Sequence, residues 1–164
     1  MAARLEPTPS QTVGPFFSFG LTTRAANELV SADDARAVEV VGTVFDGSGR
    51  PVPDAMVEVW AQEVGWGRCG TDVDGRYGFR VAKPAAADGQ APHLDVLVFA
   101  RGLLKPVLTR MYFPDEVDAN AADPVLAALA DDDGRGTLVA TADGDTVRFD
   151  LRLQGDGQTT FFAL

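Results

Sequence analysis

The sequence predicts an all-β fold: an antiparallel β-sandwich, or a barrel of the same strands, with one short helix and an extended N-terminal arm. The main evidence is the stretch Val38–Arg80. Apolar and polar residues alternate there through Val38–Phe45, through Met56–Trp60 and more loosely through Tyr77–Val81. A period of two is typical of a strand with one buried face. The links between these runs are rich in Gly, Pro and Asp, which form tight turns. The stretch is therefore expected to form an antiparallel meander.

The chain begins with a proline-rich segment. Three prolines within residues 1–21 restrict the backbone and exclude a helix interior. The segment also carries three phenylalanines, Phe16, Phe17 and Phe19. So much apolar surface is not expected to stay in water. Residues 1–37 are therefore interpreted as an arm that packs on the chain's own sandwich or on a partner subunit, ahead of a core formed by residues 38–164 in the same domain.

The rest of the chain adds strands and one helix. Further strands are expected over His93–Ala100, Val107–Phe113, Thr137–Thr141, Thr146–Leu153 and Thr159–Phe162. The first of these is apolar enough to suggest burial on both faces. Asp123 followed by Pro124 and the run VLAALA predicts a helix of about two turns, with the aspartate as its N-cap. Seven to nine short strands at close spacing are typical of a sandwich or barrel.

Composition excludes several function classes. The 164 residues suit one domain, and 46% of them are hydrophobic, as in ordinary globular proteins. The net charge of −10 argues against nucleic-acid binding, which needs a basic face, and against anionic membrane surfaces. Cys69 is the single cysteine, so no intrachain disulfide forms. No signal-peptide pattern or membrane-length apolar run is found. A soluble cytoplasmic protein is expected.

The residues alone supply no complete catalytic set. The only histidine is His93 and no nucleophile elbow occurs, which argues against a hydrolytic triad. Cys69 is interpreted as a small buried residue. His93 and Asp95 share one strand face and could both be metal ligands, but one histidine cannot complete a two-histidine iron site. His93 is interpreted as a strand-start histidine with a local hydrogen bond. The acidic run 131–133 is interpreted as a solvated helix end.

Several motifs together resemble the intradiol ring-cleaving dioxygenases. They are Thr8–Phe17 (TPSQTVGPFF), Gly42–Asp46 (GTVFD), Gly49–Trp60 (GRPVPDAMVEVW) and the pieces GR, TD and DG within Gly67–Gly75. Further stretches, among them Ala91-Pro92-His93, Phe99–Leu103 (FARGL) and Thr109–Phe113 (TRMYF), resemble the alpha type of subunit in that family. The resemblance covers nearly the whole chain. It implies a β-sandwich fold and a role in the oxidative cleavage of a catechol.

The resemblance also implies where this chain departs from a catalytic subunit, which binds ferric iron with two tyrosinates and two histidines. Only Tyr77 and Tyr112 are present, both in strand segments, and the connection between Trp60 and Gly67 is too short for the ligand-bearing insertion. Alanines follow Lys83-Pro84 where a second tyrosine is expected. The His-x-His pair is reduced to His93-Leu94-Asp95 or displaced from it, depending on register. No metal ligand or catalytic residue is therefore expected here, and the Fe(III) of the complex is expected on a partner beta subunit.

The resemblance implies a substrate-facing role for an alpha-type subunit, whose arm and one loop form part of the wall of the partner's active site. The matching residues are Thr12, Gly14, Pro15 and Arg135. An arginine suits an anionic benzoate, and Gly-Pro suits a rigid, close backbone approach. Two other readings are a self-sufficient dioxygenase, which the missing ligands disfavour, and a transthyretin-like β-sandwich binding module without enzymatic role. Such a module has no use for the Thr-Pro-Ser-Gln-Thr arm.

Overall fold

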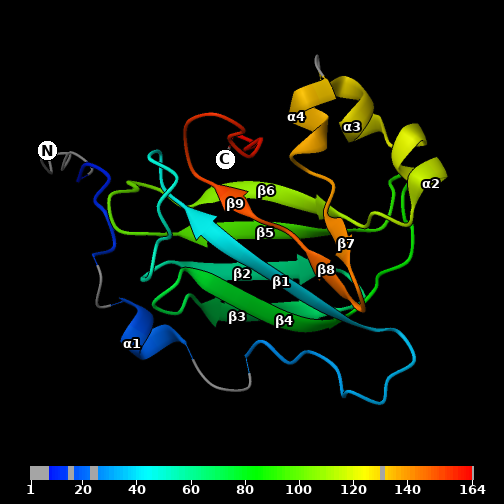
Figure 1. The fold of residues 1–164 in the computed structure, drawn as a ribbon, viewed down its shortest axis with the longest axis horizontal. Coiled ribbons are helices and arrows are strands. Elements are labelled where there is room, and N and C mark those ends of the chain that lie inside the picture. The colour runs from blue at the N-terminus through cyan, green and yellow to red at the C-terminus, as the bar shows by residue number, and fades with distance from the viewer. Residues whose placement is uncertain (1–7, 15–16, 23–25, 130–131, 164) are drawn as a thin grey trace, which may run out of the picture.

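Two β-sheets pack face to face in the computed structural model, which describes residues 8–14, 17–22, 26–129 and 132–163 (Figure 1). The first sheet has the order β4 (Arg76–Ala82), β1 (Ala37–Phe45), β8 (Thr146–Arg148) and β7 (Thr141–Asp143), and β9 (Leu151–Arg152) also pairs with β1. The second has the order β3 (Gly65–Gly70), β2 (Met56–Ala61), β5 (His93–Phe99) and β6 (Val107–Tyr112). The predicted β-sandwich is confirmed.

The expected meander is wrong. β1 pairs with β4, while β2 pairs with β3 and β5 in the opposite sheet, so the chain crosses the sandwich after β1 and again after β3. The first sheet is also mixed rather than purely antiparallel, since β1 runs parallel to both β8 and β9. Alternation shows that one face of a strand is buried, but it does not identify the strand's neighbour. Ten residues join β1 to β2, more than a tight hairpin needs.

Inward-facing residues of both sheets form one apolar core. Its members include Val44, Val57, Phe79, Val96 and Leu151, all at most 2% exposed. Burial on both faces of β5 is wrong, because Leu94, Val96 and Val98 are buried while the alternate side chains are only half-buried. The predicted hairpin near the C-terminus is confirmed as β7 and β8, with shorter strands than expected. The segment expected as a last strand makes only the bridge between Leu108 and Phe162.

Four short helices occur in the described ranges, rather than the single one expected: α1 (Phe17–Leu21), α2 (Val117–Ala122), α3 (Pro124–Ala128) and α4 (Asp132–Gly136). The predicted N-cap of α3 is confirmed, since the Asp123 carboxylate accepts hydrogen bonds from the amides of Val125 and Leu126. The other three have five or six residues, too few to show a helical period in the sequence. α2, α3 and α4 gather beyond the end of β6 (Figure 1). No helix of the described ranges is long and apolar enough to cross a membrane.

Part of the N-terminal segment packs on the chain's own sheets. The Arg68 and Arg80 amides donate to the carbonyls of Ala26 and Asn27, at 2.7 and 2.9 Å. The Leu29 amide donates to the Arg80 carbonyl, and the Arg68 guanidinium to the Leu21 carbonyl. These bonds reach two edge strands, β3 of the second sheet through Arg68 and β4 of the first sheet through Arg80, whereas α2–α4 lie near β6. On the outer face of the second sheet, the alternate side chains of β5 stay half-buried.

Candidate functional site

Three segments that are distant in the sequence line one pocket of about 500 Å3 at the open end of the second sheet. The first is the turn after β2, from Trp60 to Glu63; the second is the connection from Pro84 to Gln90; the third is the start of β5. These are the three places where the family resemblance locates the iron ligands of a catalytic subunit. The fold brings them together here without tyrosines in either loop.

His93 and Asp95 project from the outer face of β5, as their i, i+2 spacing predicts. The His93 ring stacks against Tyr112 at 5.3 Å, and its Nδ1 lies 2.7 Å from the Ala91 carbonyl. The interpretation of a locally hydrogen-bonded histidine at a strand start is therefore confirmed. His93 Nε2 is 3.9 Å from an oxygen of Asp95, so only a weak contact joins these two potential metal ligands.

Arg110 holds the position next to this pair, on the neighbouring strand β6. Its Nε donates to Asp95 at 3.0 Å and its Nη1 to Gln90 at 2.7 Å, while Nη1 also lies 3.4 Å from the Tyr112 hydroxyl. Desolvation opposes the charge, but hydrogen bonding to Tyr112 and Asp95 outweighs it, and the pKa of Arg110 lies above its ordinary value. A permanent cation thus neutralises the Asp95 carboxylate.

The tyrosines are held in their neutral form. Burial, together with the nearby Asp123 carboxylate, raises the pKa of Tyr112 to about 12. Burial raises the pKa of Tyr77 even further, and its hydroxyl donates to the Phe149 carbonyl at 2.5 Å. Neither phenol lines the polar pocket, and each donates its hydroxyl to an acceptor of the protein, Tyr77 to the Phe149 carbonyl and Tyr112 to Asp123. In the described ranges no three His, Cys, Asp or Glu side chains gather as a metal site. The residues present do not fit a ferric centre.

An apolar cleft of about 500 Å3 adjoins the polar pocket on the same sheet face. Both share Trp60, Asp95 and Arg110, and the cleft is further lined by Leu97, Leu108, Val125 and Phe162. The Trp60 side chain is 46% exposed between them. The face thus retains the hollow shape of a binding site, with an ion pair where a metal would need its ligands.

The structure separates the residues that the resemblance assigns to the substrate. The Thr12 hydroxyl accepts a hydrogen bond from the Gly102 amide at 2.9 Å, in the loop before β6. Gly14 has φ of +70°, a conformation that favours glycine, and Pro15 lies outside the described residues. Arg135 is half-buried in α4, where its guanidinium donates to the Leu129 carbonyl at 2.9 and 3.3 Å. Thr12 therefore contacts the loop before β6, whereas Arg135 belongs to α4, which lies beyond the other end of β6 (Figure 1).

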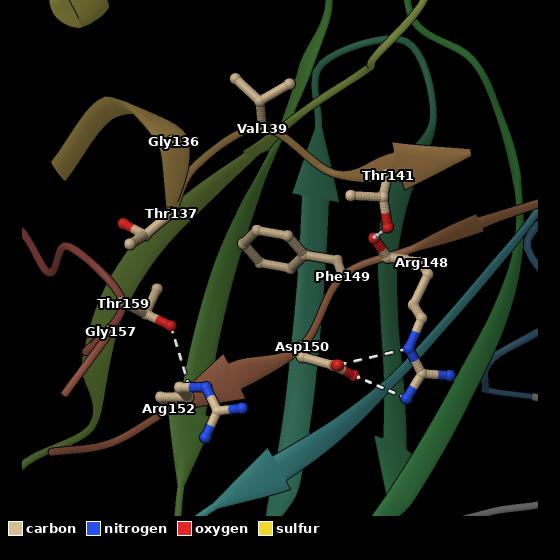
Figure 2. Close-up of a pocket in the computed structure, with 10 residues that line it drawn as sticks. All are labelled: Gly136, Thr137, Val139, Thr141, Arg148, Phe149, Asp150, Arg152, Gly157 and Thr159. Carbon is tan, nitrogen blue, oxygen red and sulfur yellow. Dashed lines mark hydrogen bonds and ion pairs between the residues drawn. The ribbon is translucent and has the colours of Figure 1, made fainter. Parts of the chain in front are cut away.

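A small polar hollow of about 160 Å3 follows α4, between the segment 136–141 and the C-terminal tail (Figure 2). The Arg148 guanidinium pairs with Asp150 at 3.0 and 3.2 Å, and the carboxylate also accepts from the Thr43 amide. Arg152 stacks on the Phe45 ring at 4.7 Å. These contacts join β8 and β9 to β1.

Sequence reasoning missed Arg110 and Gln90. The signal for Arg110 is the single charge within the run Val107–Phe113, but an opposite charge on the neighbouring strand becomes visible only once the register is known. Gln90 lies in a loop, where polar residues are common and therefore do not indicate a function. Cys69 is half-buried rather than fully buried, and desolvation raises the pKa of its thiol.

The fold is that of an intradiol dioxygenase domain. It superposes with a TM-score of 0.62, at 24% identity, on the dioxygenase domain of a dioxygenase carbohydrate-binding fusion from Streptomyces sp. SirexAA-E, over 92% of this chain and 99% of that one. No protein-family model matches the chain. The chain is 40% identical over 194 residues to the protocatechuate 3,4-dioxygenase alpha chain of Burkholderia cepacia, covering 96% of this chain and 98% of that one. It therefore belongs to the protocatechuate 3,4-dioxygenase alpha-chain family of intradiol dioxygenases, and the resemblance seen in its motifs is confirmed.

The beta chain of the same enzyme from Burkholderia cepacia is a more distant relative. It is 31% identical over 147 residues, covering 73% of this chain and 59% of that one. Alpha and beta chains are therefore variants of one fold.

Proposed function

We propose that this chain is the noncatalytic alpha subunit of a protocatechuate 3,4-dioxygenase, in which a partner beta chain holds the Fe(III). The complex would cleave protocatechuate with O2 to 3-carboxy-cis,cis-muconate in the β-ketoadipate pathway of aromatic catabolism. The observation that carries this proposal is the Asp95–Arg110 ion pair, which stands where a catalytic subunit needs ligands, in a chain of the alpha family. In this proposal the chain forms part of the substrate pocket and contacts the substrate. The metal, which the partner would hold, would activate the catechol.

The substrate contact proposed for this chain is a charge-assisted bond from Arg135 to the benzoate carboxylate, with Thr12, Gly14 and Pro15 forming the neighbouring wall. Thr12 contacts the loop before β6, and Arg135 belongs to α4 beyond the other end of that strand (Figure 1), so assembly would have to reposition the arm for both to meet one substrate molecule. Residues 8–13 are exposed, which leaves them accessible to a partner. The arm 1–37 would then pack partly on the beta chain and partly on the core 38–164. We place the complex in the cytoplasm, in keeping with a single, unpaired cysteine.

The test is expression of the chain alone and together with a beta chain. Alone, it is expected to be colourless and free of stoichiometric iron; the complex is expected to show tyrosinate-to-iron absorption and activity. Arg135→Ala should raise KM about tenfold at unchanged iron content, which is the loss expected for one charge-assisted hydrogen bond. Iron binding and cleavage by the chain alone would contradict the proposal, as would a lasting monomer that ignores the beta chain. An unchanged KM would remove Arg135 from the site.

A further inference from the structure

Three threonine hydroxyls connect α4 to β6 through the C-terminal tail. The Thr109 hydroxyl on β6 donates to the Thr160 carbonyl at 2.7 Å. The hydroxyls of Thr160 and Thr137 both reach the Gly134 carbonyl, at 2.9 and 2.8 Å. The Thr160 amide in turn donates to the Thr137 hydroxyl at 2.9 Å. We refer to Thr109, Thr137 and Thr160 as the threonine clamp.

The clamp closes on the peptide unit that precedes Arg135. Gly134 is the residue before Arg135, and the Leu138 amide donates to the Arg135 carbonyl at 3.0 Å. The tail is itself fixed, since the Phe162 amide donates to the Leu108 carbonyl at 2.8 Å. Figure 2 shows Thr137 beside the tail at Thr159, in the hollow that both line. The backbone of Arg135 is thus connected by hydrogen bonds to β6 of the second sheet.

α4 needs such external support. A helix of five residues is too short to be stable by its own hydrogen bonds. Thr109 is fully buried, and Thr137 and Thr160 are half-buried, so water competes only partly for their hydroxyls. The guanidinium of Arg135 is braced separately by the Leu129 carbonyl. Backbone and side chain of the arginine are therefore each held by a partner from outside α4.

We propose that Thr137 and Thr160 are positioning residues for Arg135: their hydroxyls hold the Gly134 carbonyl so that the arginine faces the carboxylate of a substrate bound in the assembled complex. The inference rests on the proposed role of Arg135 and adds two residues that contact no substrate themselves. A guanidinium that is displaced by about 1 Å loses most of the geometry of a bidentate contact. The clamp therefore determines substrate affinity.

The experiment uses the reconstituted alpha–beta complex with Thr160→Val and Thr137→Val, which remove a hydroxyl at nearly constant volume. Each is expected to raise KM for protocatechuate about fivefold, with kcat and iron content within about twofold of the parent. Thr160→Ser, which keeps the hydroxyl, is expected to restore the parental KM. Thr146→Val is the matched control, because its exposed hydroxyl bonds to the Asp143 carbonyl within the β7–β8 turn. KM for a catechol without a carboxylate should not change.

The outcomes separate this inference from the proposed function. If Arg135→Ala raises KM and neither valine variant does, the clamp has no positioning role while Arg135 keeps its own. If Arg135→Ala leaves KM unchanged, the proposed role of Arg135 fails first. In an Arg135→Ala background, Thr160→Val should cause no further rise, and an additive rise would overturn the inference. If Thr160→Val does not assemble with the beta chain, Thr160→Ala, which adds no bulk, takes its place. The same KM changes are then expected, and the same results would overturn the inference.

Discussion

Arg110 is the residue around which the polar pocket is organised. Its guanidinium joins Asp95 on β5, Gln90 in the preceding loop and Tyr112 on its own strand. A metal ion would supply positive charge to the same carboxylate, but the guanidinium supplies it without exchange or oxidation. Removing one partner of such a pair lowers the free energy of unfolding by more than the pair itself contributes, because the remaining charge stays partly desolvated.

Arg110→Met should therefore lower the free energy of unfolding by about 2 kcal/mol, less than for a fully buried pair because Asp95 is 27% exposed. Adding Asp95→Asn to this variant should recover about 1 kcal/mol, since the orphaned charge is removed. Denaturant unfolding of the single and double variants measures both values. A double variant that is as unstable as the sum of the singles would show that Arg110 acts by packing alone.

The two tyrosines give a pH-dependent prediction. Burial raises both folded-state pKa values above the ordinary value of about 10, and that of Tyr112 lies near 12. Their contribution to stability is therefore complete below about pH 10 and is lost as the pH rises through the folded values. Ultraviolet titration should show no tyrosinate in the folded chain at pH 10, and about half ionisation in the unfolded chain. Tyr77→Phe isolates Tyr112, and ionisation of that variant near pH 10 while folded would contradict the assigned environment.

The position of the candidate site could be predicted from the sequence, but the contacts within it could not. The alanines after Pro84, the short turn after Trp60 and the His93–Asp95 pair were all recognisable, because a missing ligand is visible as a residue type. The ion pair was not predictable, since Arg110 meets Asp95 only through the register of β5 and β6. The separation of Thr12 from Arg135 depends in the same way on tertiary contacts, which no local pattern contains.

At the level of elements, Asp123 connects α3 with the start of β5. One carboxylate oxygen caps α3, and the other accepts from the Ala91 amide at 2.8 Å. Asp123→Asn should lower the free energy of unfolding by about 2 kcal/mol, because an amide can satisfy either the cap or the Ala91 amide but turns a donor toward the other. Calorimetry of this variant, with Asp118→Asn on α2 as the control, measures the loss. Equal stability of both variants would mean that water replaces the Ala91 bond.

The strand β1 requires a glycine at position 42. A Cβ there would lie 1.9 Å from the Phe149 carbonyl oxygen and 2.7 Å from the Tyr77 hydroxyl, at the point where β1 passes from β8 to β9. Gly42→Ala should therefore lower the free energy of unfolding by about 3 kcal/mol, since backbone has to move. Gly78→Ala is the matched control, because the nearest atom to its added Cβ is 3.8 Å away. If Gly42→Ala left the free energy of unfolding unchanged, β8 and β9 would be free to move away from β1.

Element prediction succeeded where a local pattern was sufficient. The cap of α3 and the β7–β8 turn follow from a few neighbouring residues, and both are present. The meander failed because β1, β2 and β4 share the same alternation and differ only in their partners. Partner choice in a sandwich depends on how the two sheets close over one core, which is a property of the whole chain.

At the scale of the molecule, the proposed function depends on the outer face of the second sheet. Here that face carries an ion pair, an exposed tryptophan and an apolar cleft that Val125 of α3 and Phe162 of the C-terminal tail help to line. Under the proposed function, a stable core is combined with a surface that contributes to the site of a partner chain. The segments proposed to do so, the arm and the Arg135 loop, lie outside the strands that hold the core together.

Removal of residues 1–14 separates these two roles. Residues 8–13 are exposed, so the truncated chain should unfold at the same denaturant midpoint as the parent. In complex with a beta chain it should show a raised KM, because Thr12 and Gly14 are then missing from the proposed wall. Removal of residues 1–7 alone keeps both residues and is the control.

The combination of Thr12→Ala with Arg135→Ala completes the test. If the coupling free energy calculated from the KM values exceeds about 0.5 kcal/mol, arm and loop meet one substrate molecule, whereas additive effects would place them at separate sites.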